Sequence, residues 1–141
     1  MLDWLSLTLL AALTAALLLG GMVYYALLFT PLVFRHLPRE TAGPFLRQVF
    51  PAYYLTGAIL AGLAGLFALW AQPIEAAILL IVAAGFGYAR LVLLPQVDAA
   101  RQAAGGATGE RFRLLHRLSV VINLLQAIAV AAVLIGLMLA A

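Results

Sequence analysis

The sequence feature that most constrains the fold is an uncharged stretch that runs from Trp4 to Phe34. Its 31 residues exceed the roughly 20 that an α-helix needs to cross the hydrocarbon core of a bilayer. Further uncharged stretches cover residues 48–74, 76–89 and 118–141. Because 67% of the chain is hydrophobic and only 9% is charged, its apolar surface cannot be buried in a water-soluble globule. Lipid must therefore solvate much of this chain.

We expect an all-α fold, an integral membrane four-helix bundle that forms one domain over residues 1–141. The third span contains only 14 uncharged residues before Arg90. Arg90 would lie about 25 Å along a helix that starts at Pro73, near the far edge of the bilayer core, where its side chain can reach the interface. No tandem repeat is evident in the sequence. The predicted spans are about 5–34, 51–71, 73–94 and 117–139.

Prolines divide the connection between the first two spans. The Leu37-Pro38 pair predicts a break in the helix, and Gly43-Pro44 predicts the start of another. We expect this second helix to be interfacial, lying along the membrane surface before span two. Pro51 is then expected to bend the chain from the surface into the second span.

Polar residues follow Pro95 and precede Leu118, which predicts that the third and fourth spans continue beyond the bilayer as a helical hairpin. The loop of this hairpin is expected over Gly105 to Gly109. Small residues at four-residue spacing, among them Gly57, Ala61 and Gly65, predict a tightly packed face on the second span. Gly20 and Gly21 suggest close packing of the first span as well.

All eight basic residues are arginines, and they concentrate in the first and third connections. By the positive-inside rule both connections are cytosolic and both termini lie outside. We expect a multi-pass protein of the bacterial inner (plasma) membrane, with the bilayer as its partner and anionic lipid headgroups as further candidates. Topology accounts for the arginines, so nucleic acid is not an expected partner. A homo-oligomer formed through small-residue faces is an open alternative.

The polar residues of the fourth span share one face, because they are spaced three, four and three residues apart. They are His116, Ser119, Asn123 and Gln126. Arg35, Tyr54 and Arg90 are expected to converge with His116 at the cytosolic helix ends. One interpretation is that these groups form interhelical hydrogen bonds. The other is a polar pocket that binds or transports a small solute, ion or metal.

Two further functions are alternatives to a binding or transport pocket. His36 and His116 are weak candidates for a metal or haem site, since imidazole pairs bind such groups. The chain contains no cysteine, and no cofactor is predicted. An adaptor that presents the cytosolic hairpin to a partner is the other alternative. An enzyme is not expected, because no pair of carboxylates is placed for acid-base chemistry and no nucleophile motif is present.

Several motifs together resemble the transmembrane protein 205-like family, whose bacterial members carry a domain of unknown function. In order they are Phe34-Arg35-x-Leu37-Pro38-Arg39, Phe50-Pro51-x-Tyr53-Tyr54, Arg90 and His116-x-x-Ser119-x-x-x-Asn123, within residues 20 to 125. The resemblance implies a four-helix integral membrane protein and little about activity. The chain departs from the pattern at Tyr88-Ala89-Arg90, where relatives often carry an asparagine.

Overall fold

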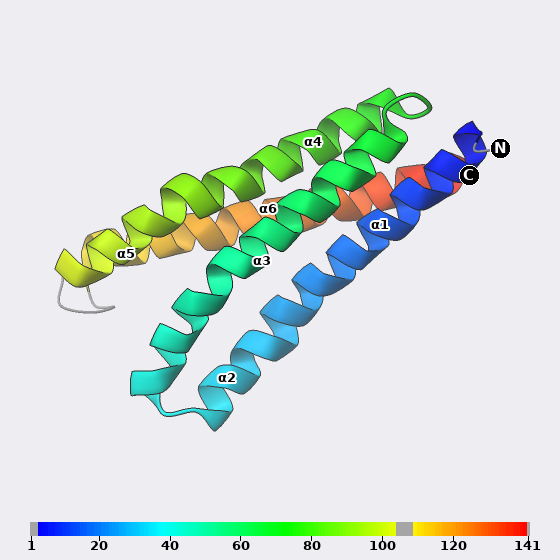
Figure 1. Ribbon diagram of the computed structural model, residues 1–141. Helices are drawn as coiled ribbons and strands as arrows, with labels where there is room; N and C mark the ends of the chain where they lie inside the picture. Colours follow the sequence, from blue (N-terminus) through cyan, green and yellow to red (C-terminus); the bar gives the residue numbers. More distant parts are fainter. Residues whose placement is uncertain (1–2, 104–108, 141) are drawn as a thin grey trace.

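Four long helical rods make up the structure, a computed structural model that describes residues 3–103 and 109–140, with only the backbone of Trp4 and Leu5. The first rod consists of α1 (Trp4–Tyr24), the π-helix η1 (Tyr25–Phe29) and α2 (Thr30–His36). The second is α3 (Arg39–Ala68). The third consists of α4 (Pro73–Tyr88), the π-helix η2 (Ala89–Leu93) and α5 (Leu94–Ala103), and the fourth is α6 (Glu110–Ala140). Both chain ends lie at the same end of the bundle (Figure 1).

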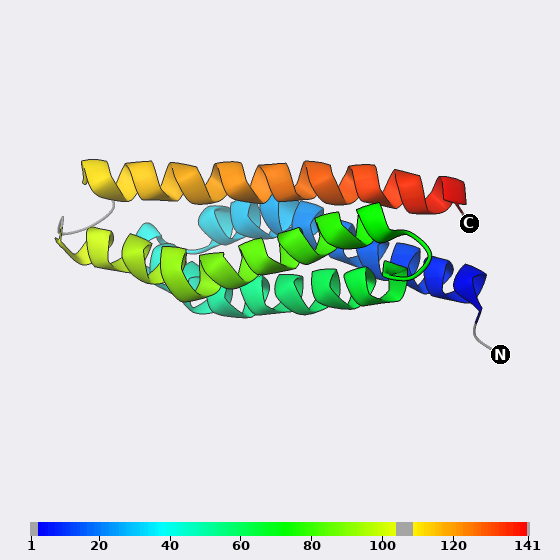
Figure 2. The same ribbon diagram turned by 90° about the horizontal axis from the view of Figure 1, so that it is seen from above.

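The rods pack in a ring in which α1 and α4 each contact both α3 and α6. Figure 2 shows α6 running straight along the full length of the other helices. The core on the ring axis combines small residues such as Ala11, Ala61 and Ala64 with larger ones such as Leu79 and Phe86. This arrangement confirms the predicted all-α four-helix membrane bundle.

Each rod is long and apolar enough to cross a membrane. The candidate spans are Ser6–His36, Arg39–Ala68, Pro73–Ala103 and Glu110–Ala140. At about 1.5 Å per residue, each exceeds the ~30 Å thickness of a bilayer core. Large apolar side chains cover the outside of the bundle, including Leu13, Leu27, Ile81 and Leu139. An outward apolar surface of this kind fits lipid rather than water.

The predicted interfacial helix is wrong. Pro44 and Pro51 both lie inside α3, which starts at Arg39 and runs without interruption through the expected bend. Each proline removes one backbone hydrogen bond, but packing holds the helix together, because its apolar face contacts α2. Ala42 and Leu46 are buried with Val33 in a small separate core. That face is covered by protein and does not lie on the membrane surface.

Each π-helix ends two residues before a proline, η1 before Pro31 and η2 before Pro95. In both, the residue preceding the proline donates its backbone N–H five residues back, from Thr30 to Tyr25 and from Leu94 to Ala89. A proline ring crowds the carbonyl four residues earlier, and the wider π turn makes room for it. The helices therefore continue past Pro31 and Pro95.

The two π-helices belong to an internal correspondence that the sequence did not reveal. Gly21, Tyr24 and Pro31 in the first rod recur with the same spacing as Gly85, Tyr88 and Pro95 in the third. Buried residues follow the same register of 64 positions, pairing Leu18 with Val82, Met22 with Phe86, and Val33 with Val97. The first and third rods are thus equivalent by position, and each is followed by a helix that returns antiparallel to it.

The small residues of α3 pack as expected, with one exception. Gly57 lies against the ring of Phe86, and Gly65 lies against Leu80. Gly62, in contrast, faces open space. Gly20 and Gly21 also have open space around them. The close packing predicted at these two glycines is therefore absent within the described part of a single chain.

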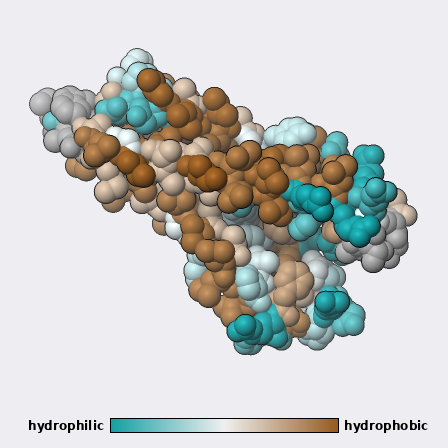
Figure 3. All heavy atoms as spheres, turned by 180° about the vertical axis from the view of Figure 1, so that it is seen from behind, coloured by the Kyte–Doolittle hydropathy of each residue, from teal (hydrophilic) through white to brown (hydrophobic). Residues whose placement is uncertain are grey.

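The end of the bundle opposite the termini divides into two arms, each tipped with hydrophilic residues (Figures 1 and 3). The first arm consists of α2 and residues 39–54 of α3. The second consists of η2, α5 and residues 110–122 of α6, which agrees with the predicted extension of the helical hairpin. Its predicted loop falls largely on residues outside the described part. Each arm has its own small core, around Leu46 in the first and Phe112 in the second.

Candidate functional site

A polar cleft lies between the two arms. Its outer cavity, of about 150 Å³, is lined by Gly43, Arg47 and Tyr54 from the first arm and by Asp98, Arg101 and His116 from the second, among others. An inner cavity of about 250 Å³ continues the cleft toward the bundle core. The two cavities share Thr30, Phe50, Tyr54, His116 and Ser119, so they form one site.

Charge concentrates in the outer cavity. Arg101 reaches across the cleft, since a Cβ atom at Gly43 would lie 3.4 Å from its Nη1 atom, and its guanidinium lies 4.7 Å from the centre of the Phe112 ring. Arg47 and Asp98 line the same cavity as Arg101. The cleft thus brings two guanidinium groups and one carboxylate together.

Several polar atoms of the cleft are buried without a hydrogen-bond partner among the described residues. They are Nε of Arg47, Nε of Arg101, Oδ1 of Asp98 and the hydroxyl of Tyr25. Buried polar groups in native proteins are nearly always hydrogen-bonded, to protein or to bound molecules. Their clustering along one cleft indicates that its binding capacity is not used up within the chain.

His116 lies where the outer and inner cavities meet. Its ring stacks on Phe112, with ring centres 5.8 Å apart and planes at 8°. The residue lies near the start of the uncharged part of α6. Its imidazole offers the cleft two ring nitrogens for hydrogen bonding.

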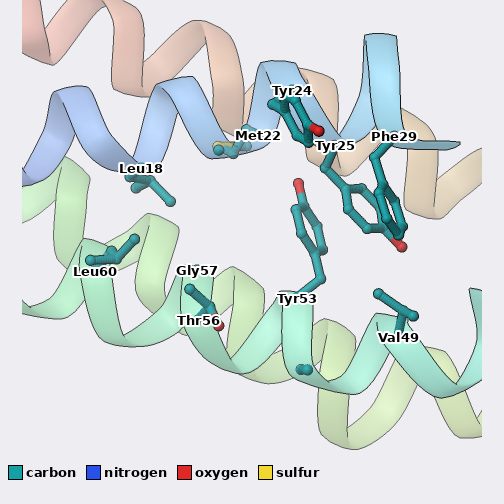
Figure 4. Close-up of a pocket in the computed structure, with 12 residues that line it drawn as sticks. Leu18, Met22, Tyr24, Tyr25, Phe29, Val49, Tyr53, Thr56, Gly57 and Leu60 are labelled. Carbon is teal, nitrogen blue, oxygen red and sulfur yellow. The ribbon is translucent and has the colours of Figure 1, made fainter. Parts of the chain in front are cut away.

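Aromatic side chains of η1 and α3 line the inner cavity, and Phe86 of α4 packs against Tyr53 and Tyr54 in the core below it. Tyr25 stacks on Tyr53 with ring centres 4.2 Å apart, and Figure 4 shows both side chains, with Phe29, between the first rod and α3. The Tyr53 hydroxyl donates to Oδ1 of Asn123 at 2.9 Å. This bond joins α3 to α6 across the ring of helices and places both groups at the inner cavity.

The other predicted polar residues of α6 take different positions. Ser119 lines both cavities, and its hydroxyl donates to the backbone carbonyl of His116 at 2.7 Å. Gln126 is only 7% exposed, and its amide donates to the Val82 carbonyl of α4 at 3.0 Å. Gln126 thus joins two helices and is not part of the cleft. This fits the interpretation that the polar residues of α6 form interhelical hydrogen bonds.

Tyr54 and His116 line the cleft as predicted, but neither Arg35 nor Arg90 does. Arg90 donates from Nε to the Pro51 carbonyl at 3.1 Å, so it links η2 to α3. Arg35 is exposed on α2 and lines neither cavity of the cleft. His36 lines a separate hollow beside Phe45, so the structure does not bring the two histidines into one cavity. Among the described residues, no group of three or more histidine or acidic side chains could hold a metal ion.

Sequence reasoning missed the residues that give the cleft its charge. Arg47, Asp98 and Arg101 were interpreted as topology signals and loop polarity, because nothing in the sequence shows that the arms face one another. The spacing of Asp98 and Arg101, three residues apart on one helix, was the available signal.

The fold and the cleft define a multi-pass membrane protein with a polar site at one end. The family of proteins that carry the domain of unknown function DUF4149 matches residues 13–106, which is two thirds of the chain, and the chain belongs to this family. The matched region covers the first rod from within α1, all of α3, and the third rod. No curated protein and no solved structure matches the chain.

Proposed function

We propose that this membrane protein binds a small anionic ligand in the cleft between its two arms. The observation that carries the proposal is that Arg47 and Arg101, from opposite arms, line one cavity with their Nε atoms buried and unpartnered among the described residues. Guanidinium groups form their strongest hydrogen bonds with carboxylate and phosphate oxygens. An anion held between them would also relieve the repulsion between the two positive charges.

Other ligand classes fit this cleft less well. The two guanidinium groups repel a metal cation, and His36 lies at a separate hollow, so a metal or haem site that uses both histidines is not supported. A catalytic role is not part of the proposal, because Asp98 is the one carboxylate among the residues that line the outer cavity. Acid-base chemistry on two carboxylates has no basis there.

Binding is better supported than transport by a single chain. Beyond the inner cavity a pocket of about 320 Å³ lies between the first rod and α3. The described core around it is packed with buried side chains, among them Ala61, Leu79 and Phe86. A path across the membrane would have to open through this packing or form between several copies. The small face of α3 is already used inside the chain, at Gly57 and Gly65, so an oligomer would need another surface.

The adaptor alternative has one supporting observation. The second arm has its own core of Leu93, Val97, Ala100 and Phe112, so it is an ordered projection that a partner could contact. Its inner face lines the cleft, however, which leaves only its outer face for such a role. Substitution of the exposed Arg111 would impair an adaptor and leave anion binding unchanged.

The orientation and the wider family also belong to the proposal. We propose that the arms face the cytosol of a bacterium and both termini face outward, because the arms carry all eight arginines. Reaction of single cysteines with an impermeant reagent from each side of the membrane tests this. The motifs around Pro38, Pro51 and Asn123 further support kinship with the transmembrane protein 205-like family.

The proposal is tested by native mass spectrometry of the detergent-purified protein with inorganic phosphate, alongside an absorption spectrum and elemental analysis. We expect one saturable phosphate adduct, weakened roughly tenfold or more by Arg101→Gln, because a charge-assisted hydrogen bond contributes about 1.5–3 kcal/mol. Arg35→Gln is the matched control, since it removes the same charge from an exposed site outside the cleft. Equal binding by both variants, or none by the wild type, would contradict the proposal.

A further inference from the structure

An apolar groove leads out of the inner cavity between α1 and α6. This groove, of about 260 Å³, shares Ala26, Val120 and Asn123 with the inner cavity. Its remaining lining is apolar and includes Leu27 and Leu124. The charged outer cavity therefore leads through the polar inner cavity into this apolar groove.

The groove faces the surroundings of the bundle. Leu27, Val120 and Leu124 are all exposed large hydrophobic residues, and they belong to the uncharged parts of helices that are long enough to span a membrane. In a bilayer the neighbours of this groove are acyl chains. A lipid can thus approach the cleft sideways through the gap between α1 and α6.

The charges of the outer cavity define the head group. Two guanidinium groups and one carboxylate leave a single positive charge, and the His116 imidazole at the junction adds hydrogen-bonding capacity. A monoanion balances this set, whereas a cationic or neutral head group would leave a guanidinium unpaired. The inner cavity offers the Tyr25 hydroxyl, buried without a partner among the described residues, as a further hydrogen-bonding group.

From this order of charged, polar and apolar surfaces we infer that the ligand is a membrane phospholipid with a monoanionic phosphodiester head group, such as phosphatidylglycerol. The phosphate lies between Arg47 and Arg101, and one acyl chain leaves through the groove between α1 and α6. This inference rests on the proposed anion site, and it adds the source of the anion and the direction from which it arrives.

Three probes compared by native mass spectrometry separate the parts of this inference. They are phosphatidylglycerol, phosphatidylcholine with the same acyl chains, and glycerophosphoglycerol, which is the phosphatidylglycerol head group without chains. We expect phosphatidylglycerol to bind about tenfold or more tightly than either of the others. Arg101→Gln should remove this preference over phosphatidylcholine, and Arg35→Gln should retain it.

A second pair of variants tests the groove. Val120 is 53% exposed and lines the groove, whereas its neighbour Val121, 45% exposed, is not among the lining residues. Val120→Trp should weaken phosphatidylglycerol several-fold and leave glycerophosphoglycerol unchanged, and Val121→Trp should affect neither. Thermal unfolding of both variants shows whether they remain folded.

The outcomes distinguish the two proposals. If glycerophosphoglycerol binds as tightly as the lipid and Val120→Trp has no effect, the anion site stands and the lipid inference fails. If neither anion binds, or if Arg101→Gln changes nothing, both fail. Equal binding of phosphatidylcholine and phosphatidylglycerol would show a lipid site without charge selection, which also overturns the inference.

Discussion

At Gly57 the packing between helices leaves no room for a side chain. A Cβ atom at this position would lie 2.6 Å from Cε1 of Phe86, and the whole ring edge is within similar reach. Phe86 is itself fully buried and packs against Tyr53 and Tyr54. The contact between Gly57 and Phe86 therefore supports the aromatic side chains that line the inner cavity.

We predict that Gly57→Ala destabilises the protein by about 1–3 kcal/mol, the usual effect of overpacking a buried contact. Gly62→Ala is the control, because it lies on the same helix with nothing within 4 Å of the added methyl group. It should be neutral or slightly stabilising, since alanine favours a helix over glycine. Thermal unfolding in detergent measures both, and equal shifts would contradict the packing described here.

The polar residues of α6 show how far the sequence determines the site. Helical spacing predicted one shared face for His116, Ser119 and Asn123, and all three line the inner cavity. The same spacing could not separate Asn123, which meets Tyr53 at the cavity, from Gln126, which meets a backbone carbonyl of α4. That difference depends on the neighbour opposite each side chain, and a single sequence does not specify the neighbour.

At the scale of elements, the two π-helices lie at equivalent positions in the first and third rods, where the arms begin. A π turn with a proline beside it has fewer regular hydrogen bonds than the α-helix around it. Helices bend most readily at such positions. We therefore expect the two segments to act as hinges at the base of the cleft.

Replacing both hinge prolines should stiffen the arms. We predict that a Pro31→Ala and Pro95→Ala double variant narrows the distribution of distances between spin labels at Arg39 and Arg111, on opposite arms. Labels at Ile74 and Leu139, near the end that carries the termini, serve as the control and should show the same narrow distribution in both proteins. A wild-type distribution between the arms that is already as narrow as the control would rule out hinging.

Prolines also explain where the prediction of elements succeeded and failed. The break at Leu37-Pro38 and the start at Pro73 are confirmed, because both prolines lie at helix ends, where no hydrogen bond is lost. Pro51 was expected to bend the chain from the membrane surface into the second span, but the contacts of Ala42 and Leu46 with α2 keep α3 continuous. Tertiary packing outweighed a local preference there, and the sequence does not show that packing directly.

At the scale of the whole molecule, the bundle has a tightly packed end and a divided end. Alanine and glycine bring the helices together around the Ala61 and Ala64 layer, whereas separate cores around Leu46 and Phe112 hold the two arms apart. Composition and hydropathy were enough to predict four spans. They could not predict the cleft, which arises because each arm has a core of its own.

The central claim is that Arg47 and Arg101 hold one anion together. A double-mutant cycle of glycerophosphoglycerol binding, with Arg47→Gln, Arg101→Gln and the double variant, tests it most directly. If both arginines contact the same phosphate, each single substitution weakens binding about tenfold or more, and the double substitution adds little further loss. If the losses of binding free energy from the two single substitutions add fully in the double variant, the two arginines act at independent sites. Unchanged binding in all three variants would show that the anion lies elsewhere.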